Sequence, residues 1–357
     1  MMSRVDLIRV MVLLVSILVA ASVMATPENS IHTSSVSEST LTLAAVGDLM
    51  IGSWGQILIE KFGADYPFQD ISTIIKSADI ATGNLEGPHC ETGQAMEAKK
   101  YVFRMPIEQL DAYRNAGFDV FTLANNHSMD FGSDCLMQCI EALNERDLKH
   151  CGAGKNLSEA NQPAVIVKNG ISIGILGYSA TFPEEAWATE IKAGTVFPER
   201  SLVINSIERA SREYDVVAVH FHWGEECRSD PKEYQRELAH LVIDHGADLV
   251  IGHHPHVLQG IEIYKNRLIF YSLGNFIFAS YSEKAKTSII ASITFNHEGK
   301  ILKAEIIPVN VYNLDVDLQP KPLPNNPAIL DEIRKKSDLV PNAIAPVINS
   351  DGSLTFP

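Results

Sequence analysis

The stretch Asp248-Leu249-Val250-Ile251-Gly252-His253-His254-Pro255-His256 joins a short apolar run to three histidines. An apolar run of this length, closed by a glycine, is typical of a buried strand. Directly before it, residues 232–245 place apolar side chains at intervals of three and four, which is the pattern of an amphipathic helix. Imidazole is a favoured ligand of zinc, iron and similar ions. The stretch therefore predicts a helix, then a strand whose end carries metal ligands.

The same arrangement recurs along the chain. Short apolar runs occupy residues 41–46, 78–84, 119–124, 171–177, 215–219 and 267–271, and helical spacing occupies 68–77, 107–116, 133–146 and 202–213. Residues 286–312 are rich in strand-forming residues, and a proline-rich break at 319–324 precedes a helix at 328–337 and an irregular tail. Alternating strands and helices predict a layered α/β fold in one domain, with functional loops at the strand ends.

Polar residues follow these apolar runs in a fixed order. Any one of them alone has an ordinary explanation as a turn residue, a helix cap or a packed histidine. The exception is the segment with His254 and His256, which we expect to be extended across Pro255 so that both side chains project to the same side. The full set of candidate metal ligands is Asp48, Glu86, Asn126, His222, His254 and His256.

The bulk composition excludes some functions. A formal net charge of −15 argues against nucleic acid as a partner, because binding nucleic acid needs basic surface. The five cysteines permit two disulfides and a spare, and their spacing does not fix the pairing. Cys135 and Cys139 stand one helical turn apart in an apolar stripe, so we expect both to be buried free thiols. No zinc–cysteine site is indicated.

The N-terminal residues have the pattern of an export signal. Arg4 and Arg9 precede an uncharged run over residues 10–25 that ends in small side chains, which predicts a secretory signal peptide or an uncleaved N-terminal anchor over residues 1–25. Residues 26–40 read as a polar linker, 41–312 as the folded domain and 313–357 as a C-terminal extension packed on it. Either signal places the folded part outside the cytosol.

Several motifs resemble a known family. They are Ala45-Val46-Gly47-Asp48-Leu49-Met50, Gly83-Asn84-Leu85-Glu86-Gly87-Pro88, Phe103-Arg104-Met105-Pro106, Ala116-Gly117-Phe118-Asp119 with 123–132, His222-Trp223-Gly224-Glu225-Glu226, residues 245–260, and 270–276. In this order they resemble the calcineurin-like metallophosphoesterases, and more closely their CapA branch, the poly-γ-glutamate capsule biosynthesis proteins. The resemblance implies a four-layer α/β/β/α sandwich with metal-binding loops along one edge.

The resemblance also implies roles for the metal ligands. Asp48 would hold the first metal, Glu86 would bridge, and Asn126 would give an amide oxygen to the second. The coordination shells of the metals would be completed by His222, His254 and His256. His253 can be aligned to the family pattern in place of His254. The implied cofactors are one or two divalent ions, either Mn, Zn or Fe.

Four further residues would act on the substrate. His127 would donate a proton to the leaving group, and Asp130 would orient the His127 ring. Arg104 and Glu225 are candidate substrate-binding residues, because guanidinium pairs with phosphate or carboxylate. An ordinary surface ion pair explains either of these two equally well.

The sequence departs from the general phosphoesterase pattern at two positions. Met50 stands where those enzymes commonly have a first-metal histidine, and Glu86 stands where they have a bridging aspartate. Both departures fit the CapA branch. They make hydrolytic activity a weaker expectation than metal binding, because two metals are what clamp the attacking and leaving oxygens in phosphoryl transfer.

Three functions compete at this stage. The favoured one is an exported metal-dependent hydrolase that acts on phosphoester bonds. The second is a non-hydrolytic metal-binding component of a membrane-bound poly-γ-glutamate synthesis or export assembly, where the bonds of the polymer are amides without phosphorus. The substrate is accordingly a phosphoester or an anionic polymer. The third, an α/β domain with incidental histidines, ranks below both.

Overall fold

A computed structural model describes residues 39–97 and 99–356, which form one compact unit. The predicted signal or anchor and most of the polar linker lie outside the described residues. Within the described part, no helix is both long and apolar enough to cross a membrane.

Two sheets lie at the centre of this unit. The eight-stranded sheet has the order β16 (Lys321–Pro322), β15 (Ile301–Asn310), β14 (Thr287–Phe295), β1 (Leu41–Met50), β2 (Ile80–Leu85), β3 (Val120–Thr122) and β4 (Lys149–Cys151), and β13 (Asn275–Phe278) pairs with β1. The six-stranded sheet has the order β11 (Ile261–Tyr264), β12 (Arg267–Phe270), β10 (Leu249–His253), β9 (Val216–His222), β7 (Ile171–Ser179) and β6 (Ala164–Lys168). Neighbours β1, β2 and β3 are parallel, as are β7, β9, β10 and β12, so their carboxyl ends meet at one edge of each sheet.

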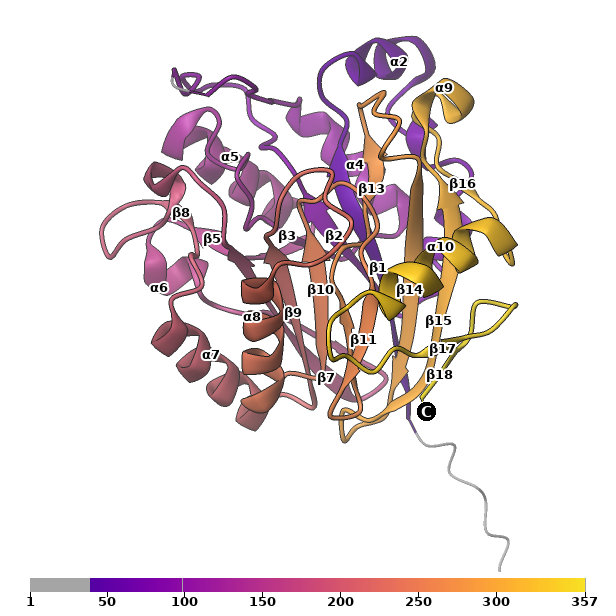
Figure 1. Cartoon of the computed structure of the whole chain (residues 1–357). Helices are drawn as coiled ribbons and strands as arrows, with labels where there is room; N and C mark the ends of the chain where they lie inside the picture. The colour runs from indigo at the N-terminus through magenta and orange to yellow at the C-terminus, as the bar shows by residue number, and fades with distance from the viewer. Residues whose placement is uncertain (1–38, 98, 357) are drawn as a thin grey trace, which may run out of the picture. The chain divides into compact units, whose positions relative to one another are not determined.

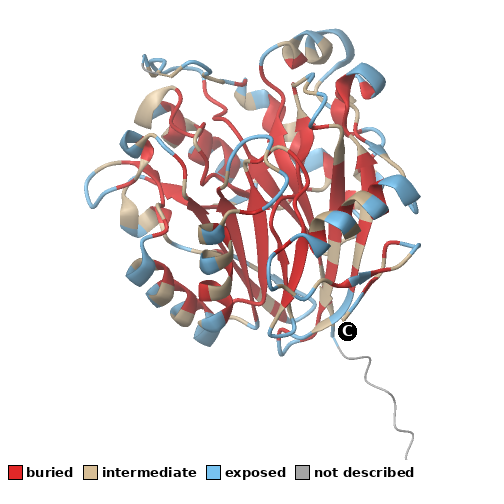
Figure 2. Ribbon diagram, viewed as in Figure 1, coloured by how far each residue is buried: buried red, intermediate tan, exposed pale blue. Residues whose placement is uncertain are grey.

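Three apolar cores separate four layers. Along β1, Leu41 and Leu43 lie in the core between the two sheets, whereas Ala44 and Val46 lie in the core under the outer helices. This alternation follows from the two-residue repeat of a strand, and it buries both faces of the sheet. Helices α4 (Leu110–Ala116) and α5 (Gly132–Glu145) contribute to the first outer core, and α7 (Arg200–Glu213) and α8 (Glu233–Asp244) to the second. Figure 1 shows α7 and α8 over the six-stranded sheet, and Figure 2 shows the buried strands between exposed helix faces. The predicted four-layer α/β/β/α sandwich in a single domain is confirmed.

The predicted helices and strands lie at or near the predicted residues with one exception, whereas several shorter elements, including β4, β6, β11 and β13, were not predicted. The expected helix at 68–77 is only a 3-10 turn, Tyr66–Phe68, and a one-turn helix, α3 (Ser72–Ile75), with residues 69–71 forming a turn between them. Helix α2 (Gly55–Phe62) was not predicted. The strand-rich region contains β14 and β15, and the helix expected at 328–337 is α10 (Pro327–Asp338). Three apolar residues of α10, Ile329, Leu330 and Ile333, join the core between the sheets.

One glycine sets the distance between β1 and the turn before β13. A Cβ atom on Gly47 would lie 1.8 Å from the carbonyl oxygen of Gly274, so only glycine fits there. The next residue, Asp48, donates its backbone N–H to that same oxygen at 3.0 Å and pairs in register with Asn275. The close approach therefore fixes the position of the first candidate ligand.

Candidate metal centre

The candidate ligands predicted from sequence meet at the carboxyl edge of both sheets. Asp48 lies on β1, Glu86 follows β2, His222 ends β9, and His254 and His256 follow β10. Two groups of three side chains have ligating atoms within 4.8 Å of one another: Glu86 with His254 and His256, and Asp48 with Glu86 and His222. Glu86 belongs to both groups, which is the arrangement that a bridging carboxylate requires.

The Oε1 atom of Glu86 is buried and has no hydrogen-bond partner among the described residues. It lies 3.7 Å from Nε2 of His256, 3.8 Å from Nε2 of His222 and 4.0 Å from Nε2 of His127. A buried carboxylate oxygen without a partner is costly, and it calls for an ion or another polar group to complete it. Carboxylate oxygen and imidazole nitrogen together suit Zn, Mn or Fe. The residues present therefore fit a divalent metal ion.

Asn84 connects the two carboxylates. Its Nδ2 atom donates to Oδ1 of Asp48 at 2.8 Å and to Oε2 of Glu86 at 3.1 Å, and it lies 3.2 Å from Nδ1 of His222. Asn84 in turn accepts a hydrogen bond from Nδ2 of Asn125 at 3.0 Å. The sequence analysis did not assign a role to Asn84, although its position one residue from a strand end was a usable signal.

His253 and His254 differ in their surroundings. The Nε2 atom of His253 lies 2.9 Å from Nδ1 of His220, and Nε2 of His220 lies 3.1 Å from Oγ1 of Thr82, so these rings form a buried chain between the sheets. The Nδ1 atoms of both His253 and His254 are buried without a hydrogen-bond partner in the described chain, but of the two only His254 belongs to the cluster with Glu86 and His256. These contacts favour His254 as the ligand and His253 as a support for Asp48, whose Oδ1 lies 3.3 Å from Nδ1 of His253.

The expectation that His254 and His256 are extended is wrong. Their φ angles are +92° and +60°, in the region that non-glycine residues rarely adopt. Strand β10 ends at His253, so the chain must turn sharply to bring both rings back toward Asp48. The turn still lets the rings converge, with centroids 6.0 Å apart. Strained backbone of this kind concentrates at functional sites.

The loop after β3 supplies the remaining predicted residues. Oδ1 of Asn126 lies 2.8 Å from Nε2 of His222, and Nδ1 of His127 lies 2.8 Å from Oδ2 of Asp130. Lys99 binds the same group, because its Nζ donates to Asp130 Oδ1 and to the backbone oxygen of Asn126 and lies 3.0 Å from Nδ1 of His127. No sequence signal pointed to Lys99, which is one lysine in a loop without a motif.

Burial and neighbouring charges shift the pKa values of the cluster. Burial raises the pKa of Glu86 well above its ordinary value. Burial would also raise the pKa of Asp48, but hydrogen bonds from His253 and His256 hold it well below its ordinary value. Burial lowers the pKa of His222 well below normal and that of His254 to about 3. Both rings are therefore neutral near pH 7, with nitrogen lone pairs free for a metal.

His256 and His127 shift in opposite directions. Burial acts to lower the pKa of His256, but the carboxylates of Glu86 and Asp48 outweigh it and raise the value to about 10. Burial lowers the pKa of His127, against the opposing effect of Asp130. His127 is thus neutral near pH 7, while His256 must give up a proton before it can bind a cation.

A cavity of about 300 Å³ opens beside the cluster, and its lining includes His127, His256, Phe103, Phe278 and Glu226. Arg104 and Glu225 are not among the residues that line it. The exposed guanidinium of Arg104 lies over the ring of Phe131 and donates to the backbone oxygen of Glu91 at 3.4 Å.

Glu225 instead forms ion pairs with Lys232 at 2.8 Å and Arg228 at 3.8 Å. These contacts match the alternative of an ordinary surface ion pair. The neighbouring acidic residue, Glu226, is the one that reaches the cavity.

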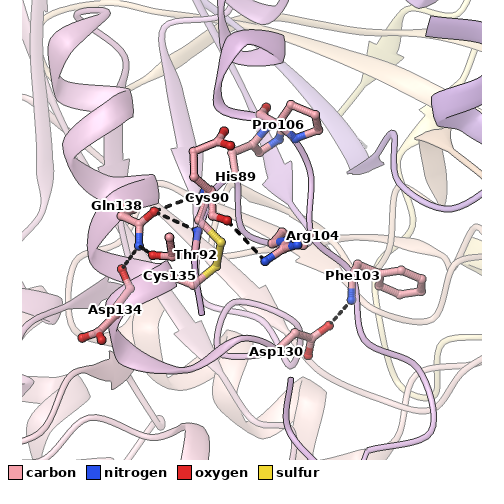
Figure 3. The surroundings of a disulfide bond; sticks show 11 residues. His89, Cys90, Thr92, Phe103, Arg104, Pro106, Asp130, Asp134, Cys135 and Gln138 are labelled. Atoms are coloured by element: carbon pink, nitrogen blue, oxygen red, sulfur yellow. Dashed lines mark hydrogen bonds between the residues drawn. A yellow bond between two sulfur atoms is a disulfide. The ribbon is translucent and has the colours of Figure 1, made fainter. Parts of the chain in front are cut away.

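A disulfide joins the segment after Glu86 to the start of α5. Cys90 and Cys135 form this bond, with their Cα atoms 5.2 Å apart, and Figure 3 shows Arg104 and Phe103 beside it. The expectation of a free thiol at Cys135 is therefore wrong, because the partner approaches from a loop 45 residues earlier and not from the same helix face. Cys139 is a buried free thiol as predicted, and Cys227 is an exposed one.

Met50 is one of the two residues at which the sequence departs from the phosphoesterase pattern expected above. Its side chain is buried, and its sulfur accepts a hydrogen bond from the backbone N–H of Gly52 at 3.1 Å. The thioether is directed into the local turn, and Met50 also lines the cavity beside the cluster.

The chain is similar to several known proteins. Residues 42–280 match the family described as Bacterial capsule synthesis protein PGA_cap. The capsule biosynthesis protein CapA of Bacillus anthracis is 34% identical over 76% of this chain and 67% of its own length. The PGA biosynthesis protein CapA of Bacillus subtilis is 31% identical over 90% of this chain and 83% of its own length. A 5'-nucleotidase precursor from Thermus thermophilus has a TM-score of 0.47 and 16% identity over 79% of this chain and 56% of that one, and we draw nothing from a likeness this weak.

Proposed function

Because the chain belongs to the bacterial capsule synthesis protein PGA_cap family, we propose that it takes part in capsule biosynthesis through a metal-dependent phosphoesterase site. The proposal places it outside the cytosol, secreted or anchored by its N-terminus. The Cys90–Cys135 disulfide supports that compartment, since such bonds persist mainly in oxidising environments. The proposed substrate is a phosphoester of the cell envelope, and the proposed partner is a membrane-bound polymer synthase complex.

One observation carries the proposal. Two clusters of three candidate ligands share Glu86, whose Oε1 atom is buried without a hydrogen-bond partner among the described residues. Glu86, His254 and His256 would hold one divalent ion, and Asp48, Glu86 and His222 another, with Asn126 beside His222. A bound divalent ion supplies a positive charge that polarises a phosphoryl oxygen and stabilises charge developing on it. We propose Mn, Zn or Fe from the mixture of imidazole and carboxylate.

His127 is placed to move a proton. Its Nδ1 atom donates to Asp130, which fixes the ring and leaves Nε2 facing Glu86 and the cavity. With its one proton on Nδ1, neutral His127 must take up a second proton on Nε2 before it can deliver that proton to a departing oxygen. Phe103 packs against the imidazole with ring centroids 4.6 Å apart and keeps one side of it dry.

The test combines elemental analysis of purified protein with phosphomonoesterase and phosphodiesterase assays across Mn, Zn and Fe. We expect His256→Ala to lose most of the bound metal and to lower turnover of an aryl phosphate at least 100-fold. His240→Ala is the matched control, because His240 lies on α8 against Tyr264 and Glu262, outside the cluster. Unchanged metal content in His256→Ala would contradict the proposed site.

A non-hydrolytic role in a polymer synthesis or export assembly is the second candidate. The side chain of Met50 favours it, because the missing imidazole weakens one metal position. In that case the folded protein would bind metal and hydrolyse no phosphoester in the same screen, while deletion of the protein would stop polymer export. Turnover that depends on His127 would exclude this candidate.

A further inference from the structure

The cavity beside the metal centre has aromatic walls. Phe103 packs on His127 with ring centroids 4.6 Å apart, and Phe278 packs on His256 with centroids 4.8 Å apart. Tyr101 also lines the cavity, and its side chain is 60% exposed. The cavity is therefore lined by three aromatic side chains, two of which pack on histidines of the cluster.

The charge of the cavity is unusual for a site near phosphate. Among the described residues that line it there is no lysine or arginine, and Glu226 is its one carboxylate. Burial raises the pKa of Glu86 and lowers that of Lys99, and Glu226 lies near enough to add to the first shift and to oppose the second. The nearby Lys99 cannot offset this charge for a ligand, because its ammonium is bound to Asp130 and to the backbone of Asn126.

We infer that this cavity receives the leaving group of the substrate, and that this group is an uncharged ring and not a polyanionic chain. The inference rests on the phosphoesterase function proposed above. Nε2 of His127 faces Glu86 at 4.0 Å, so a leaving oxygen protonated by His127 would lie at the mouth of the cavity. The atoms attached to that oxygen then fall between Phe103 and Phe278, where a ring face packs well.

A polyanion is disfavoured at the same place for an electrostatic reason. Each further carboxylate of the chain would be desolvated beside Glu226, and once a metal holds the neutral imidazole of His256 the described lining offers no cationic side chain to compensate for it. Poly-γ-glutamate itself is therefore excluded from the cavity, even if the protein acts in its biosynthesis. The substrate class is a phosphate ester of an uncharged ring.

Binding of two phosphonates to the metal-loaded protein tests this inference without relying on turnover. Phenylphosphonate carries the ring and methylphosphonate lacks it, and neither is a phosphate ester. By titration calorimetry we expect phenylphosphonate to bind at least ten-fold more tightly. Phe278→Leu keeps the bulk of the side chain without the ring and should reduce this ratio to about two. Phe62→Ala removes a phenylalanine that does not line the cavity and should leave the ratio unchanged.

The outcomes separate this inference from the proposed function. Equal affinity for the two phosphonates, binding of neither, or displacement of phenylphosphonate by poly-γ-glutamate would overturn the inference. Ring-selective binding without any phosphoester hydrolysis would uphold the ring-binding cavity and remove the proposed hydrolytic function. Hydrolysis without ring selectivity would do the reverse.

Discussion

Nε2 of His222 lies 2.8 Å from Oδ1 of Asn126, although the two residues are 96 positions apart in the chain. His222 ends a strand of the six-stranded sheet, and Asn126 follows a strand of the eight-stranded sheet. The contact therefore crosses the central interface of the sandwich. A metal bound by both would depend on the packing of one sheet against the other.

Substitution of Asn126 tests whether its amide oxygen belongs to the metal centre. We expect Asn126→Ala to weaken metal binding at least ten-fold, because an oxygen donor is lost next to His222. The melting temperature should change little, since Asn126 is half-buried and its side chain is bonded only to His222 among the described contacts. Metal affinity is measured by competition with a chromogenic chelator.

Asn115→Ala is the matched control, since Asn115 is an exposed residue of α4. It should keep wild-type metal affinity. If Asn126→Ala did so too, Asn126 would not be a ligand.

Lys99 is predicted to act through His127 and Asp130. Its ammonium is held against Oδ1 of Asp130 at 2.5 Å, so Lys99→Met should leave that carboxylate with one cation fewer and loosen the orientation of His127. We expect turnover of an aryl phosphate to fall about 10- to 100-fold with unchanged metal content. The pH profile of turnover should shift as well, because the charge beside His127 changes.

The neighbouring residue gives the control. Lys100 is exposed and lies over the ring of Tyr101, so Lys100→Met should retain wild-type turnover and pH profile. Lys99→Arg should recover part of the loss if charge is what matters. Equal effects of the Lys99 and Lys100 substitutions would show that Lys99 has no special role.

The layers and the places of the candidate ligands at the strand ends could be predicted because both depend on local pattern. Apolar runs ending in Asp48, His222 or His254 show where strands end, and parallel strands bring those ends to one edge. The motifs of the family then set the order of the ligands. For this reason the sandwich, and the convergence of Asp48 with His256, could be predicted from the sequence.

The rest depends on contacts between distant segments. The disulfide partner of Cys135, the role of Lys99 and the choice between Glu225 and Glu226 are all set by how the loop after β2 and the segment after β9 fold back. The positive φ angles of His254 and His256 follow from tertiary packing, which overrides the extended geometry expected around Pro255. None of these features follows from a periodicity or a residue spacing, so none of them could be predicted from the sequence.

The disulfide should stabilise the fold and hold the loop that carries Lys99. Cys135→Ser removes a bond across 45 residues, and loop entropy sets an upper value of roughly 4 kcal/mol for its contribution to the free energy of unfolding. We expect a lower melting temperature, with Cys227→Ser, an exposed free thiol, as the control that should melt like the wild type. Thiol titration of unreduced, denatured wild-type protein should find Cys139, Cys151 and Cys227 only. A count of five thiols would contradict the bond.

His89 predicts how stability depends on pH. Its ring is buried, Nδ1 donates to the backbone oxygen of Pro106 at 2.9 Å, and Nε2 has no hydrogen-bond partner among the described residues. Burial lowers the pKa of His89 from 6.5 to about 4, so the unfolded chain takes up a proton at higher pH than the folded one. Above pH 6.5 the neutral ring makes its full contribution to the free energy of unfolding. As the pH falls from 6.5 toward 4, this contribution decreases by roughly 3 kcal/mol. Urea unfolding at pH 7, 6, 5 and 4 should show this loss in the wild type and a shallower one in His89→Gln, and equally steep curves would assign the acid sensitivity to other groups.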